Sequence, residues 1–227
     1  MSGRVGDLSP KQEQKLKEFK ERVKDILVKP EHNDYYCLRW LRARSFDVNK
    51  AETMIRNSME TRKKMGLDTL VTDYKSPEVM EKYYQGGLVG EDKNGHPIWI
   101  DPIGNIDPKG LLKSARTKDI LLSRIQISER LWQETYPALS KKYGRRIEGM
   151  CYMIDLEGLG TKHLWKPGVD LFNKAIALIQ DNYPENLVAI YVVRAPKIFP
   201  IIYALVKPFI DENVRKKIHV LGLFINT

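Results

Sequence analysis

The sequence predicts an α/β protein in which a small helical unit precedes a larger domain built on a largely parallel sheet. Apolar residues recur at helical spacing through about the first 65 positions, and a glycine-rich passage begins after Pro77. Short apolar runs then alternate with helical segments to the end of the chain, which is typical of a parallel sheet. At 227 residues with 42% hydrophobic content, the chain can bury a sizeable core.

Residues 1–75 are expected to form the helical unit. Ser9 and Pro10 occupy the usual cap and first-turn positions of a helix. The apolar residues that follow at helical spacing are Leu16, Phe19, Val23, Ile26 and Leu27. A second helix is expected within residues 34–47, and a third from Val48 to about Met65, where Gly66 stops it. The unit should end near Tyr74.

Residues 76–227 are expected to form the sheet domain. The run DKNGHP at 92–97 predicts a hairpin or tight turn that leads into a strand, Ile98 to Asp101. Long helical segments are predicted over 117–143 and from about 166 to 183. The remaining strands are predicted at 147–156, 187–194 and 218–225.

The stretch from Ala195 to Lys217 has an unusual composition. No residue between Ile198 and Val206 is charged or strongly polar, so a helix here has no solvated stripe. Lys197 and Lys207 flank a run that is far too short to cross a bilayer. Two interpretations remain open at this point. The helix is either buried in ordinary core, or it covers an apolar pocket and at times faces a membrane.

The charge balance favours anionic partners, because 38 Lys and Arg against 29 Asp and Glu leave a net charge of +9. Phospholipid headgroups are favoured over nucleic acid, since Tyr35, Tyr36 and Trp40 lie at core-like helical spacing and not in a strand-borne stacking set. The first residues lack the apolar segment of a secretory signal, and Cys37 and Cys151 suit a reducing compartment. We therefore expect a cytoplasmic protein, peripheral on membranes.

Catalytic and metal-binding motifs are not evident in the sequence. It contains no GxSxG, HExxH, GxGxxG or GxxxxGK[ST] pattern, and its four histidines lack metal-ligand spacing, so no metal or cofactor is expected. Asp155 and Glu157 are compatible with acid and base chemistry or with capping a turn before Gly158, and capping is favoured. The basic clusters at 141–146 and 214–217 either bind phosphates or form a solvated face.

Several motifs resemble one known family. In order, they are LRWLRARSFDVNKA, DKNGHPIWID, MIDLEGLGTKHLWKP, NYPENL, VVRAPKIFP, LVKPFIDENVRKKI and HVLG. Together they resemble the Sec14-like, or CRAL-TRIO, lipid-binding family. The segments MSGRVGDLSPKQ and EGLGTKHLWKP are similar to the animal Sec14-like subgroup of supernatant protein factor, also called tocopherol-associated protein.

The resemblance implies a fold and a gate. In this family a small N-terminal helical unit precedes a CRAL-TRIO domain, whose sheet floors a hydrophobic lipid cavity closed by a mobile helix. The stretch Ala195–Lys217 corresponds to that helix, and we call it the gate segment. Its Pro196, Pro200 and Pro208 would divide it into rigid pieces. Subgroup members continue with a closing segment and a β-sandwich (GOLD) domain, so this domain is expected to be truncated at its C-terminus and to lack GOLD.

The family's phosphatidylinositol headgroup site matches Arg44, Glu185 and Lys217 here, although Val214 replaces an accompanying threonine. Met150 and Tyr152 occupy the places of a serine and a threonine that bind phosphatidylcholine in the prototype, which favours a more apolar ligand such as tocopherol, squalene or another isoprenoid. Strand alternation puts these two residues and Ile154 on one face, which we expect to line the cavity. The other expected cavity and gate residues are Trp99, Ile198, Phe199, Ile201, Ile202, Leu205 and Phe209.

The resemblance thus implies a monomeric lipid-binding and lipid-transfer protein that is not an enzyme and that contacts membranes transiently, preferring anionic phospholipid. One alternative is a lipid-sensing regulatory module that presents lipid to an enzyme of lipid or sterol metabolism. Another is a lipid-modifying hydrolase or isomerase built on Asp155 and Glu157.

Overall fold

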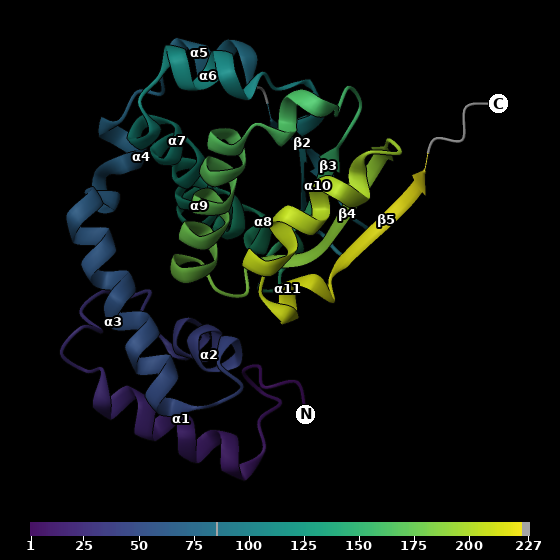
Figure 1. Ribbon diagram of the computed structural model, residues 1–227. Helices are drawn as coiled ribbons and strands as arrows, with labels where there is room; N and C mark the ends of the chain where they lie inside the picture. The colour runs from purple at the N-terminus through teal and green to yellow at the C-terminus, as the bar shows by residue number, and fades with distance from the viewer. Residues whose placement is uncertain (85, 224–227) are drawn as a thin grey trace. The chain divides into compact units, whose positions relative to one another are not determined.

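The computed structural model describes residues 1–84 and 86–223 (Figure 1). Its sheet has five strands in sequence order, β1-β2-β3-β4-β5. The first pair is antiparallel and the other three pairs are parallel. The predicted α/β class with a largely parallel sheet is confirmed.

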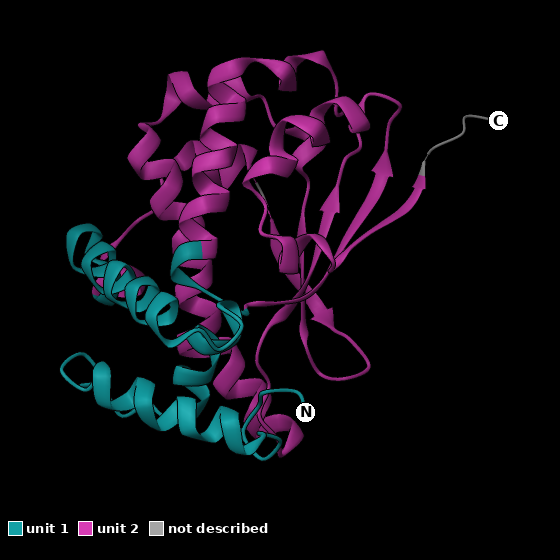
Figure 2. Cartoon of the chain, turned by 60° about the horizontal axis from the view of Figure 1, so that its bottom comes forward, with its two compact units in different colours: residues 1–68, 181–185 teal, residues 69–180, 186–227 magenta. Residues whose placement is uncertain are grey.

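The chain divides into two compact units (Figure 2). Unit 1 comprises residues 1–68 and 181–185, and unit 2 comprises 69–180 and 186–227. The sequence-based division after residue 75 rests only on the change in composition along the chain near Pro77. It did not anticipate that the short segment 181–185 would join a helical unit that is remote in sequence.

Unit 1 contains the three predicted helices, α1 (Pro10–Arg22), α2 (Asp34–Ala43) and α3 (Val48–Met65). Ser9 and Gln12 form a capping box at the start of α1, in which each side chain accepts from the other's backbone N–H. Gly66, with φ of 68°, ends α3 in the left-handed conformation. The fully buried core includes Phe19, Leu38, Trp40, Leu41 and Ile55.

Helix α2 ends earlier than residue 47, the end of the predicted span. Ser45 and Phe46 adopt positive φ values of 51° and 60°, which an α-helix cannot contain. The amide of Phe46 instead donates to the carbonyl of Leu41 at 2.7 Å and closes a tight turn. This turn redirects the chain into α3.

The first part of unit 2 contains the predicted hairpin, formed by β1 (Gly87–Glu91) and β2 (Pro97–Asp101). The Asp92 carboxylate organises the turn by accepting from the amides of Asn94 and His96, each at 2.8 Å. The short helices and turns before and after the hairpin are η1 (Leu67–Thr69), α4 (Leu70–Asp73), α5 (Glu78–Tyr83), η2 (Ile103–Asn105) and α6 (Pro108–Ser114).

The long helix predicted over 117–143 is present but interrupted. It consists of α7 (Thr117–Arg130), a π-helical turn η3 (Leu131–Thr135) and α8 (Tyr136–Tyr143). Pro137 lies in the first turn of α8 and has no amide to donate, so the regular helical ladder changes just before it.

The second part of unit 2 follows the predicted order. Its elements are β3 (Met150–Asp155), η4 (Thr161–Leu164), α9 (Lys166–Asn182), β4 (Leu187–Ala195), α10 (Phe199–Val206), η5 (Lys207–Phe209), α11 (Glu212–Arg215) and β5 (Ile218–Leu223). The last two residues of the predicted final strand lie outside the described part of the chain. No helix within the described residues is both long and apolar enough to cross a bilayer.

Candidate functional site

One face of the sheet carries the predicted cavity residues. Trp99 is the register neighbour of Tyr152, and Tyr152 is that of Ile190. Register neighbours in a parallel ladder direct their side chains to the same face, so these three form a row across the sheet. Met150 and Ile154 flank Tyr152 at alternate positions of β3 and share this face. We call it the inward face.

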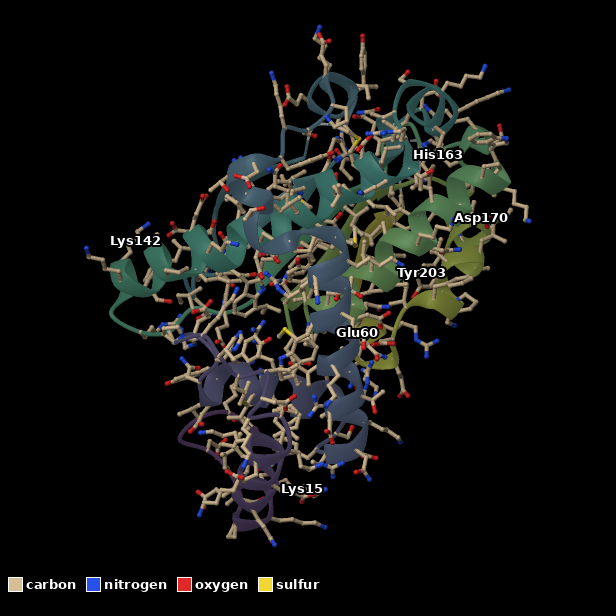
Figure 3. All side chains as sticks on the ribbon, turned by 90° about the vertical axis from the view of Figure 1, so that its left-hand side faces the viewer. Lys15, Glu60, Lys142, His163, Asp170 and Tyr203 are labelled. Carbon is tan, nitrogen blue, oxygen red and sulfur yellow. The ribbon has the colours of Figure 1, made fainter. Side chains whose placement is uncertain are left out.

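The gate segment packs against the inward face. Ile198, Phe199 and Ile202 pack against a cluster of buried residues, Leu156, Leu159, Ile190, Val192 and Ala195, and Tyr152 and Ile154 pack against the same cluster. Tyr203 of α10, labelled in Figure 3, stacks its ring on that of Phe199, with centroids 5.5 Å apart. The gate segment therefore lies over the face that strand alternation gives to Met150, Tyr152 and Ile154, and the role of that face as a cavity lining stays a prediction.

Three other predicted cavity residues have a different placement. The exposed fractions of Ile201, Leu205 and Phe209 are 59%, 43% and 51%, so we assign them to the outer surface of the gate segment and not to its lining. Ile201 and Leu205 are four positions apart and share one side of α10. The hydrophobic composition of this helix could not distinguish the covered side from the exposed side.

Several side chains on and near the inward face lie deep in unit 2 but keep part of their surface accessible. Burial raises the pKa of Tyr84 and Tyr152, although both side chains keep part of their surface accessible. Along α9, every residue from Ala175 to Gln180 is partly accessible, and none is fully buried or fully exposed. A surface helix over a filled core normally shows a sharper contrast between its two sides.

Arg194 fastens the N-terminal end of the gate segment. Its Nε donates to Asp155 Oδ1 at 2.8 Å, and its other nitrogens contact Asp155 and Glu157. Burial acts to raise the pKa of Asp155, but the hydrogen bonds from Arg194 and from the amide of Glu157, together with the positive charge of Arg194, outweigh burial and leave the pKa below its ordinary value. The backbone of Arg194 has a φ of 53°, an uncommon conformation for a residue with a side chain.

The two carboxylates thus have a structural role of the kind the sequence favoured. Asp155 also accepts from the amide of Glu157 at 3.1 Å, as a turn-capping carboxylate does. Sequence reasoning missed Arg194, although a single charged residue at the end of an apolar strand was a signal. Among the described residues no group of His, Cys, Asp and Glu has the arrangement of a metal site.

Gln180 of α9 fastens the other end of the gate segment. Its side-chain Nε2 donates to the carbonyl of Phe209 at 2.9 Å, and its Oε1 accepts from the amide of Asp211 at 2.9 Å. One amide side chain therefore binds the backbone on both sides of Ile210. We refer to these two bonds as the Gln180 clasp.

The three residues matched to the headgroup site lie in different local environments. Arg44, at the end of α2, lines an open pocket of about 400 Å³ in unit 1, together with Asn49, Lys50, Thr53, Met54, Asn57 and Asp181. The carboxylate of Glu185 lies 3.6 Å from Nε of Arg42, which sequence reasoning passed over in the same motif. In unit 2, Nζ of Lys217 donates to the carbonyl of Leu187 at 2.7 Å. The shared headgroup role of Arg44, Glu185 and Lys217 stays a prediction.

Comparison with family models defines the class of protein. The CRAL/TRIO domain matches residues 81–223, and the CRAL/TRIO N-terminal domain matches residues 15–57. The chain belongs to the CRAL-TRIO family, so the family resemblance seen in the sequence is confirmed.

Particular relatives are similar over almost the whole chain. "Protein real-time" of Aedes aegypti is 39% identical over 222 residues, which is 96% of this chain and 34% of the relative. "Protein real-time" of Anopheles gambiae is 38% identical over 222 residues, 96% of this chain and 32% of the relative. "CRAL-TRIO domain-containing protein T23G5.2" of Caenorhabditis elegans is 38% identical over 218 residues, 96% of this chain and 30% of the relative. The chain spans about a third of the length of these relatives.

A solved structure, "Crystal structure of Sfh5", has the same fold, with a TM-score of 0.74. It is 18% identical, and the alignment covers 92% of this chain and 79% of that one. At this identity the likeness concerns the fold alone. The narrower resemblance to the supernatant protein factor subgroup stays a prediction.

Proposed function

We propose that this chain binds a hydrophobic lipid inside unit 2, between the inward face and the gate segment, and transfers it between membranes when the gate segment opens. Membership in the CRAL-TRIO family supports lipid binding. The observation that carries the proposal is the residual accessibility of deep side chains such as Tyr84 and Tyr152, because side chains that border an internal space have this property.

The energetics of lipid transfer require such a space. Moving a lipid with about 30 methylenes into water costs on the order of 25 kcal/mol, at about 0.8 kcal/mol per CH₂. An exposed groove cannot offset this cost, whereas a closed apolar interior nearly can. Exchange between protein and bilayer is then close to neutral, and opening of the gate segment sets the rate.

The outer side of the gate segment is suited to membrane contact. Ile201, Leu205 and Phe209 expose apolar surface, and the flanking Lys197 and Lys207 are also exposed. Apolar side chains between lysines suit the boundary between acyl chains and anionic headgroups. The net charge of +9 acts in the same direction, so we propose a cytoplasmic monomer that visits membranes with anionic phospholipid.

Arg44 and Lys217 are proposed to contact phosphate if the ligand is phosphatidylinositol, with Glu185 accepting from inositol hydroxyls. The variant Arg44→Ala with Lys217→Ala should lower phosphatidylinositol pickup from vesicles and leave tocopherol or squalene uptake largely intact. Equal loss of all three lipids would contradict the headgroup assignment.

The alternative is a lipid-sensing module that presents lipid to an enzyme of lipid or sterol metabolism. A vesicle-to-vesicle transfer assay distinguishes the two functions. A transfer protein moves labelled lipid catalytically, whereas a presenting module binds about one lipid per chain and moves little.

The central proposal is tested by incubating the purified chain with vesicles of mixed lipids, re-isolating it and measuring bound lipid by native mass spectrometry. One apolar lipid per chain is expected. Recovery of the chain without lipid under all vesicle compositions would contradict the proposed function.

A further inference from the structure

A buried ion pair lies on the inward face of the sheet. Asp101, the last residue of β2, has an exposed fraction of 0%. It accepts hydrogen bonds from Arg124 Nη2 of α7 and from the hydroxyl of Tyr152 on β3. The Arg124 guanidinium also lies over the ring of Tyr84, 4.4 Å from its centroid. We call these four residues the buried polar cluster.

Both members of the ion pair have hydrogen-bonding capacity left over. A guanidinium carries five N–H donors, and Asp101 is the only acceptor of Arg124 among the residues described. Asp101 Oδ1 has no hydrogen-bond partner among the residues that the structure describes, although it is fully buried. No hydrogen bond of the Tyr84 hydroxyl is found within the described chain. Each unmet buried group of this kind costs about 1–3 kcal/mol, so a polar partner here would stabilise the protein.

The cluster is not completely enclosed by the surrounding protein. Burial acts to lower the pKa of Arg124, but the charges around it keep the guanidinium protonated. The Arg124 side chain nevertheless keeps 11% of its surface accessible. A charged group that is deep in the unit and still accessible can donate its remaining N–H groups to a molecule in the interior.

The charges of the cluster limit the chemistry of that molecule. The positive charge of Arg124 and the negative charge of Asp101 cancel, so the cluster offers no net attraction to an anionic phosphate. A hydrocarbon would leave the donors of Arg124 unpaired. An uncharged hydroxyl suits the cluster, because it accepts from Arg124 and also donates to the phenol oxygen of Tyr84 or Tyr152, side chains that keep part of their surface accessible.

We propose that the buried polar cluster of Tyr84, Asp101, Arg124 and Tyr152 binds the hydroxyl group of a lipid alcohol, so that the interior selects lipid alcohols over hydrocarbons of the same size. This inference rests on the lipid-binding function proposed above and specifies its ligand class. One hydrogen bond to a charged donor contributes about 1.5–3 kcal/mol, which corresponds to at least about tenfold selection.

The test is a competition between octadecanol and octadecane, which share a chain length and differ in one hydroxyl. The full chain is incubated with phosphatidylcholine vesicles that contain equal amounts of both, and the bound lipids are extracted and measured by mass spectrometry. Bound octadecanol is expected to exceed octadecane at least about tenfold, relative to the vesicles. Equal capture would overturn the hydroxyl site but not lipid binding, whereas capture of neither lipid, nor of phosphatidylcholine, would instead contradict the proposed function.

The double variant Arg124→Met with Asp101→Leu removes the cluster without leaving a buried charge unpaired. Replacing both members of a buried ion pair by apolar residues is usually tolerated, whereas removing one member is not. This variant is expected to capture octadecane and to lose the preference for octadecanol. Retention of the full preference would overturn the proposal.

Two further variants complete the test. Arg116→Met removes an 84% exposed arginine just before α7 that pairs with Asp119, and it should keep the preference. Tyr84→Phe removes one hydroxyl and keeps the ring under Arg124, so it gives a result even where the double variant does not fold. It should lower the preference by several-fold, and an unchanged preference would exclude Tyr84 from the site.

Discussion

Helices α3 of unit 1 and α9 of unit 2 have similar lengths, 18 and 17 residues, but their inner sides are covered to different degrees. The inner side of α3 is buried at Val48, Ala51, Met54, Ile55 and Ser58, and Ala51 and Ile55 are fully covered. The middle of α9, residues 175–180, is partly accessible on all sides. Its hydrophobic residues therefore do not have the same complete set of neighbours.

The contrast shows that an amphipathic pattern specifies an inner side but not what fills the space beneath it. The core beneath α3 consists of covered side chains, among them Phe19, Leu41 and Ile55, as native packing requires. In unit 2 the apolar side chains of α9 remain partly uncovered, as do Trp99, Tyr152 and Ile154 of the inward face, which is what the proposed lipid-binding interior requires. The predictions below test this contrast, from the largest expected effect to the smallest.

Truncating an isoleucine should cost much more in α3 than in α9. Ile55→Ala creates a new cavity in a filled core and should lower the free energy of unfolding by about 2–5 kcal/mol. Ile176→Ala, on α9, should cost less than about 1.5 kcal/mol, because Ile176 is only partly covered and less contact is lost. Urea unfolding monitored by circular dichroism measures both changes. Equal losses would show that α9 also covers a filled core.

Asp155→Asn should weaken the attachment of the gate segment at Arg194. The hydrogen bonds from the guanidinium to a carboxylate contribute about 1.5–3 kcal/mol, and the amide accepts fewer of them. We expect a lower free energy of unfolding and faster lipid exchange. The isosteric Glu157→Gln is the matched comparison. It should have the smaller effect, because Glu157 is 60% exposed and Asp155 is 11% exposed.

The same substitution has a defined pH dependence. The folded-state pKa of Asp155 is lowered, so its contribution to stability is present above its unfolded value of about 4 and is lost as pH falls through the lower folded value. The difference in unfolding free energy between wild type and Asp155→Asn should therefore be constant near neutral pH and shrink below about pH 4. A difference that grows on acidification would contradict this assignment.

Gln180→Leu should release the C-terminal part of the gate segment at a cost of about 1–3 kcal/mol, from two hydrogen bonds. The amide of Asp211, which donates to Gln180, should lose protection in hydrogen–deuterium exchange, and lipid exchange should accelerate. Gln133→Leu is the control, because that glutamine bonds Glu129 and lies outside the gate segment. Unchanged protection of Asp211 would show that the clasp does not hold the segment.

Ile201→Ser should have the smallest effect on stability, within about 0.5 kcal/mol, since the side chain is 59% exposed. Binding to anionic vesicles should nevertheless fall about five- to thirtyfold, as expected for the loss of 1–2 kcal/mol of apolar transfer. Val28→Ser, at a 76% exposed position of unit 1, should leave vesicle binding unchanged. Equal behaviour of the two variants in a sedimentation assay would exclude the outer side of the gate segment as the membrane contact.

Local features of the fold were readable from the sequence because their causes lie within a few residues. Ser9 and Gln12 cap α1, Gly66 ends α3, and Asp92 organises the β1–β2 turn through neighbours at most four positions away. Strand alternation likewise assigned Met150, Tyr152 and Ile154 to one face. The family motifs then indicated which α/β fold these elements form.

Tertiary structure alone decided which polar groups meet and which apolar sides are covered. Arg194 pairs with Asp155, 39 positions away, and Arg124 pairs with Asp101, 23 positions away. Nothing in the local sequence around these residues indicates either ion pair. The sequence of the gate segment could not show that Ile202 faces the sheet while Ile201 is exposed, because the two side chains are identical. The sequence by itself therefore determined the elements and their order, since periodicity and capping are local. The assembled fold determined the site, since burial and charge pairing depend on distant neighbours.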